Sequence, residues 1–109
     1  MNLQPGDFAA HLHTLRVNFP FQTYIELTEL RGITIAQIQH VMRFASDHCK
    51  CWHDRRDTHN KKPIDIANLN LYHLNDWCIK PATNEHNCAF VELLAQAAQE
   101  PKWFCSHWW

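Results

Sequence analysis

The residues of this chain most able to do chemistry are its histidines and cysteines, nine and five in number. On a helix, Cys49 and His53 are four residues apart and share a face, so they could supply half of a tetrahedral zinc site. On a strand, Cys105 and His107 point to the same side and could supply another half. The candidate metal ligands are therefore Cys49, His53, Cys105 and His107.

The spacing of the cysteines nevertheless favours reduced thiols in a core over a metal site. His48 and Cys51 offer a second helical pair, but Cys49 and Cys51 point to different sides of a helix, and no Cys-x-x-Cys pair occurs. Cys49 also falls on an apolar stripe, where a buried thiol behaves as a small hydrophobic group. We therefore expect no cofactor, with a small zinc-binding interaction module as an alternative.

A cysteine nucleophile is not favoured by the sequence either. Cys105 with His107, or Cys88 with His86, would need a thiolate of lowered pKa and a third group to orient the base. Neighbouring residues on one strand rarely reach attacking geometry, and no motif singles out one cysteine. We expect no catalytic residue in this chain, which as it stands is predicted not to be an enzyme.

Composition limits the class of protein. The chain has 109 residues, 46% of them apolar, and a net charge of −1, so a small folded core is expected and no basic field calls for nucleic acid. The N-terminus lacks the apolar stretch of a secretory signal, and no run of residues approaches the length of a membrane span. The predicted location is the cytoplasm, where the cysteines stay reduced.

The elements that must position these residues are predicted to be mainly helices, with short β segments. Thr34 followed by Gln37 fits a capping box, and an apolar stripe then predicts an amphipathic helix over about 34–54. The stripe consists of Ile35, Ile38, Val41, Met42, Ala45, Cys49 and Trp52.

Other segments carry weaker signals. Residues 7–16 are weakly helical, and residues 24–30 fit either an extended piece or a helical turn. Asn70 or Asn75 could cap a short helix over 71–79, which should stop at or before Lys80 because Pro81 follows. Residues 89–98 fit a helix or a strand.

The last seven residues, Trp103 to Trp109, predict a strand, since four of them are aromatic and none is Gly or Pro. A strand of this kind is typical of a buried sheet with neighbours on either side. We therefore expect the chain to be a fragment of a larger protein, divided into an N-terminal segment (1–33), a helical region (34–100) and the first strand of a downstream domain (101–109).

Two stretches resemble blocks that recur in a family of uncharacterised proteins from unicellular eukaryotes. They are Asn70 to Thr83, and Cys88 to Ala95 followed by Pro101 to Trp109, which ends in a Trp-Phe-x-Ser-His-Trp-Trp block. In that family the block continues into a longer domain, whose opening strand is similar to that of Toll/interleukin-receptor (TIR)-like domains. The resemblance implies that Phe104 to His107 form this strand, where the nucleotide pocket of enzymatic members begins. The glutamate with which such enzymes cleave NAD lies further downstream than this chain reaches.

The sequence therefore predicts a non-catalytic N-terminal region of a larger intracellular protein, with a packing or protein-interaction role in signalling. Its expected partners are the remainder of its own polypeptide or other proteins. The enzyme alternative is the front end of a TIR-like nucleotide-processing domain that lacks its catalytic residues.

Overall fold

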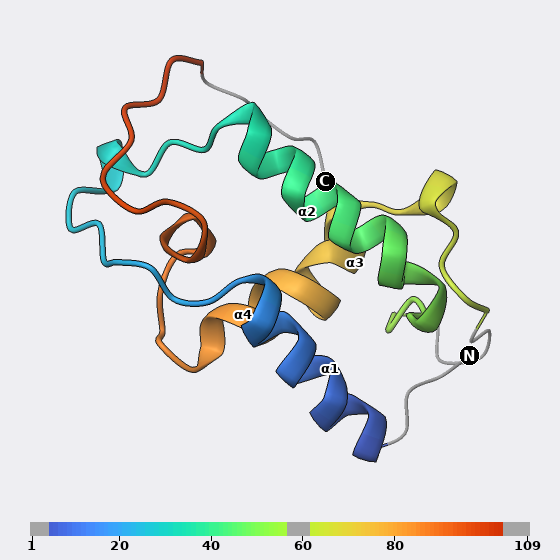
Figure 1. Ribbon diagram of the computed structural model, residues 1–109. Helices are drawn as coiled ribbons and strands as arrows, with labels where there is room; N and C mark the ends of the chain where they lie inside the picture. Colours follow the sequence, from blue (N-terminus) through green and yellow to red (C-terminus); the bar gives the residue numbers. More distant parts are fainter. Residues whose placement is uncertain (1–4, 57–61, 104–109) are drawn as a thin grey trace.

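A computed structural model describes residues 5–56 and 62–103, and the chain is mainly helical, as predicted (Figure 1). The helices are α1 (Pro5–Asn18), α2 (Ile35–His48), α3 (Leu71–Leu74) and α4 (Lys80–Asn84). A π-helical turn, Asn75–Ile79, joins α3 to α4. Short 3-10 turns lie at Thr28–Leu30, Cys49–Cys51, Ile66–Asn68 and Phe90–Leu93.

Helix α1 is longer than the weak pattern over 7–16 indicated. Proline is well suited to the first position of a helix because its missing N–H would have no partner there. The helix ends before Phe19-Pro20, where the residue preceding proline disfavours helical backbone angles. His11 and Leu15 are buried on one face of α1, and Phe19 directly after the helix is buried too, so this side of the N-terminal segment enters the core.

Helix α2 begins as predicted but ends earlier. The Thr34 hydroxyl accepts from the Gln37 N–H, and the Gln37 side chain accepts from the Thr34 N–H, which confirms the capping box. The predicted end near residue 54 is wrong, because the helix stops at His48. Beyond the 3-10 turn the backbone extends at Trp52, whose carbonyl accepts from the Ile64 N–H at 2.9 Å. This long-range bond replaces another helical turn.

The helical run 71–84 passes through the proline that was expected to stop it. Of the two predicted caps, Asn70 and Asn75, it is Asn70 that caps the run. Within it, the Lys80 N–H bonds to the Asn75 carbonyl five residues back, the pattern of a π turn. Pro81 then follows without breaking the run, so the prediction that the helix ends by Lys80 is wrong.

Two ambiguous segments are settled by the structure. Residues 89–98 form neither a full helix nor a strand, because a 3-10 turn at Phe90–Leu93 gives way to irregular backbone. Residues 24–30 are extended and then close in the turn Thr28–Leu30.

Extended pairing in residues 5–56 and 62–103 is confined to two isolated bridges, Arg31 with Gln99 and His53 with Pro63. Of the strand predicted over 103–109, only Trp103 lies within the described residues, where its backbone is irregular and its side chain is exposed. The described helices include none long and apolar enough to cross a membrane.

The core is built around stacked tryptophans. Trp52 and Trp77 lie nearly parallel, with ring centroids 6.2 Å apart. Leu15 from α1, Phe19 directly after it and Phe44 from α2 belong to the same buried cluster. A smaller cluster, Ile25, Val91 and Ala95, joins the 3-10 turn Phe90–Leu93 to the extended segment before α2. The predicted division into 1–33, 34–100 and 101–109 stays a prediction, although residues on both sides of position 33 share one core.

Candidate functional site

The predicted metal ligands divide between the core and the undescribed end of the chain. Cys49 is buried at the end of α2, and His53 packs edge-on against the Trp77 ring at 5.3 Å. Cys105 and His107, with most of the segment for which a strand was predicted, lie outside the described residues. Within 5–56 and 62–103, no group of three or more His, Cys, Asp or Glu side chains is placed to hold a metal ion.

Three of the described cysteines, Cys49, Cys78 and Cys88, lie where burial raises the pKa of the thiol. Burial raises the pKa of Cys78 to about 12. Burial, aided by the Asp65 carboxylate, also raises the pKa of Cys49, and burial beside Glu92 raises that of Cys88. A raised pKa lowers the thiolate fraction at neutral pH, so these three cysteines lack the activation that a nucleophile needs.

His11 is a buried residue that the sequence analysis missed, and its partner explains the continuous helical run. Its Nε2 lies 2.6 Å from the Trp77 carbonyl, which accepts the bond. An ordinary α-helix would satisfy that carbonyl with the N–H of residue 81, but proline has none. Burial lowers the pKa of His11, which keeps the ring neutral with its proton on Nε2. The signal in the sequence was the position of Pro81.

Glu92 is the most deeply buried charged side chain among the described residues, with 1% of its surface exposed. Its carboxylate accepts from the backbone N–H groups of Ile25 and Ala89. Burial alone would raise its pKa, but these two donors and the nearby Arg31 outweigh burial and lower it. The carboxylate therefore ties the extended segment before α2 to the 3-10 turn at Phe90–Leu93.

The His73 side chain helps to cap the helix in which it lies. Its Nδ1 accepts from the Asn70 N–H at 3.2 Å, which places the proton of the neutral ring on Nε2. That nitrogen lies 3.7 Å from Asp54 Oδ2, beyond normal hydrogen-bond length. His11 and Glu92 thus bond to the backbone of distant segments, and His73 bonds to the backbone at the start of its own helix.

The surface feature with the strongest functional implication is an exposed apolar face on the N-terminal part of α2. Only part of the predicted apolar stripe is buried. Val41, Ala45 and Cys49 lie in the core, while the residues along one edge of the stripe remain exposed. We define the α2 apolar face as Ile35, Ile38 and Met42, with exposed fractions of 75%, 45% and 39%. The spacing of three and four residues places them on one side of the helix.

The last described residues are fixed beside the start of α2 (Figure 1). The Gly32 N–H donates to the Gln99 carbonyl at 2.9 Å, and the Gln99 N–H donates to the Leu30 carbonyl at 2.7 Å. The side-chain amides of Gln99 and Gln37, a residue of α2, also bond to each other. The chain therefore reaches Trp103 from a point anchored to the first turn of α2.

Comparison with protein-family models, curated proteins and solved structures found no match to this chain. The candidate site accordingly rests on its own geometry.

Proposed function

We propose that this chain is a non-catalytic packing module in which the α2 apolar face receives the aromatic segment Trp103–Trp109 of the same polypeptide. The observation that carries the proposal is the exposure of Ile35, Ile38 and Met42 beside the anchored residues Gln99 to Pro101.

Length and polarity support this occupant. The 14 residues of α2 span about 21 Å, and the reach of any six-residue chain is at most about 20 Å, so six residues are long enough to follow the helix. One turn beyond Ile35 and Met42 the helix carries Gln39 and Ser46, which are uncharged. An aromatic segment could therefore cover the face without burying an unpaired charge.

The non-catalytic part of the proposal is supported by how the described titratable groups are used. The buried ones, His11, His73 and Glu92, bond to the backbone, and a buried group already engaged in this way is poorly placed to exchange protons with a substrate.

A double-mutant cycle on the whole chain tests the packing. Ile38→Gln and Trp108→Ala each remove one side of the proposed contact, and we expect a coupling of about 1 kcal/mol in the free energy of urea unfolding. Val17→Gln, at an exposed apolar position on α1, is the matched control and should be additive with Trp108→Ala. Additivity in both cycles would show that the segment does not lie on α2.

A further inference from the structure

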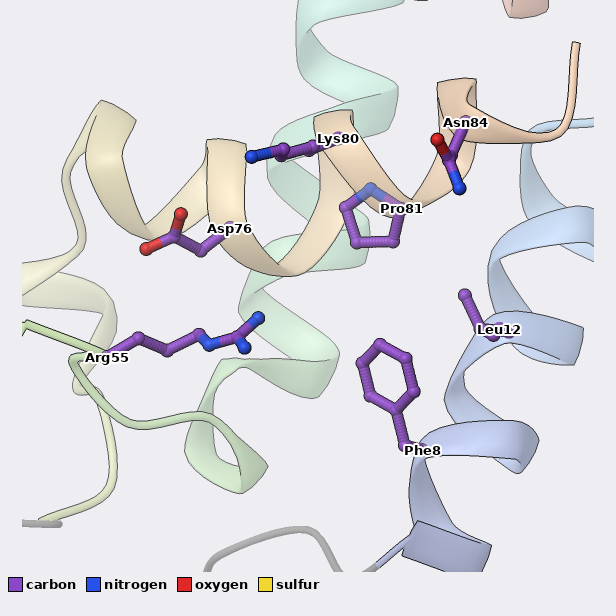
Figure 2. A pocket seen from close by; sticks show the side chains of 7 residues that line it. All are labelled: Phe8, Leu12, Arg55, Asp76, Lys80, Pro81 and Asn84. Atoms are coloured by element: carbon purple, nitrogen blue, oxygen red, sulfur yellow. The ribbon is translucent and has the colours of Figure 1, made fainter. Parts of the chain in front are cut away.

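A second feature, independent of the α2 apolar face, is a groove between α1 and the helical run 76–84 (Figure 2). Its volume is about 540 Å³, within the range of small-molecule sites. Seven residues line it: Phe8, Leu12, Arg55, Asp76, Lys80, Pro81 and Asn84.

The groove is chemically divided. Figure 2 shows the charged groups of Arg55, Asp76 and Lys80 gathered at one end, and the side chains of Phe8, Leu12 and Pro81 at the other. Phe8 and Leu12 lie one turn apart on α1 and are half-buried, so they form a preformed apolar wall.

The three charged side chains at this end of the groove form no close ion pairs. In the part of the chain that the structure describes, no ion pair within 4.0 Å joins Arg55, Asp76 or Lys80 to another residue. Asp76 and Lys80 are four residues apart, a spacing that pairs charges on an α-helix, but the π turn Asn75–Ile79 displaces this register. The Arg55 guanidinium lies 5.7 Å from the centroid of the Trp77 ring, which restrains it at the rim of the groove.

We propose that this groove binds a small amphipathic monocarboxylate, with its carboxylate between Arg55 and Lys80 and its aryl or alkyl body against Phe8, Leu12 and Pro81. Two cations and one anion leave a single net positive charge, which one carboxylate neutralises. A dianionic phosphate would place its second charge near Asp76, so the groove discriminates against it. The restricted volume favours a free small molecule over a polypeptide segment.

Titration calorimetry with 4-phenylbutyrate as the probe tests the site on the intact chain. We expect saturable binding in about the millimolar range, and weaker binding of the neutral 4-phenylbutanamide and of phenyl phosphate. Arg55→Gln and Lys80→Gln should each weaken 4-phenylbutyrate binding by about fivefold, while Arg43→Gln, an exposed cation on α2, should leave it unchanged.

Asp76→Asn is expected to strengthen binding, and a misfolded chain would not bind more tightly. Removing the carboxylate should strengthen 4-phenylbutyrate binding by about threefold and admit phenyl phosphate. Amide shifts on titration should be concentrated in α1 and α4, which checks the location. The proposal is overturned by a folded chain that binds none of the probes, by equal affinity for the amide, or by tighter binding of phenyl phosphate to the unaltered chain. It is also overturned if Arg55→Gln and Lys80→Gln bind as the unaltered chain does.

Discussion

At Glu92, two opposing effects act on one carboxylate. Removal from water favours the protonated form, while two backbone N–H donors and the nearby Arg31 favour the charged form. The balance lowers the pKa, which means that the folded state holds the charged form more firmly than the unfolded chain does. Glu92 therefore contributes stability that depends on pH.

The sign of this dependence follows from proton binding. Between the lowered folded pKa and the ordinary value of 4.5, the unfolded state binds more protons, so the free energy of unfolding rises with pH. The contribution is complete above about pH 4.5 and is lost as the pH falls through the folded pKa. In Glu92→Gln, we expect a smaller loss of stability from about pH 5 to about pH 3 than in the unaltered chain. Urea unfolding across this range measures it.

The control is Glu26→Gln, which changes an exposed glutamate and should keep the full acid loss. Parallel pH profiles for Glu92→Gln and the unaltered chain would contradict the role assigned to Glu92.

At the residue scale, the sequence predicted the features that depend on residues close together in the chain. It predicted Cys49 to be a buried thiol on the apolar stripe, and Cys49 is buried. It did not find Glu92 or His11, because their partners lie 67 and 66 residues away in the chain. A polar residue in an apolar pattern does not reveal which distant backbone group it will bond.

At the scale of elements, the π turn, Pro81 and His11 act as one unit. Pro81 leaves the Trp77 carbonyl without its ordinary donor, and His11 from α1 supplies one. The same bond joins α1 to the helical run 71–84. This coupling predicts that the cost of losing His11 depends on residue 81.

We expect His11→Phe to lower the free energy of unfolding by about 1–3 kcal/mol, because a buried carbonyl loses its donor while an aromatic ring is kept. In a Pro81→Ala background the cost should fall by about 1 kcal/mol, because the alanine N–H can bond to the Trp77 carbonyl. Urea unfolding of the four chains gives the coupling. His13→Phe, at an exposed position on α1, should cost little in either background. An equal cost of His11→Phe in both backgrounds would refute the link between His11 and Pro81.

Element prediction followed the same division between local and distant causes. The capping box at Thr34 was predicted because Thr34 and Gln37 are three apart, and Asn70 was one of the two caps predicted for the next helix. The end of α2 was not predicted, because Trp52 bonds to Ile64 and stacks on Trp77 instead of continuing the helix. The exposed edge of the stripe was also not foreseen, since periodicity identifies an apolar face without saying how much of it is covered.

At the scale of the whole molecule, Gly32 is where the segment before α2 meets the last described residues of the chain. A Cβ added there would lie 2.9 Å from both the Gln99 carbonyl oxygen and the Pro101 nitrogen. Both are backbone atoms, so the clash cannot be relieved by rotating a side chain, and the segment 99–101 must move. Such overpacking costs about 1–3 kcal/mol.

The backbone bonds between residues 30–32 and Gln99 form the anchor of the C-terminal segment. Gly32→Ala should therefore weaken this anchor and leave the rest of the fold intact. We expect faster amide hydrogen exchange at residue 32 and at Gln99, whose N–H groups form the paired backbone bonds, with little change in α1. Gln99→Ala keeps those backbone bonds and removes only the side-chain amide, so it should accelerate exchange less. If the C-terminal aromatic segment reaches α2 from this anchor, Gly32→Ala should also reduce the coupling between Ile38→Gln and Trp108→Ala. Faster exchange with the coupling intact would mean that the segment finds the α2 apolar face without the anchor. Unchanged exchange would mean that the contact at Gly32 does not hold the chain there.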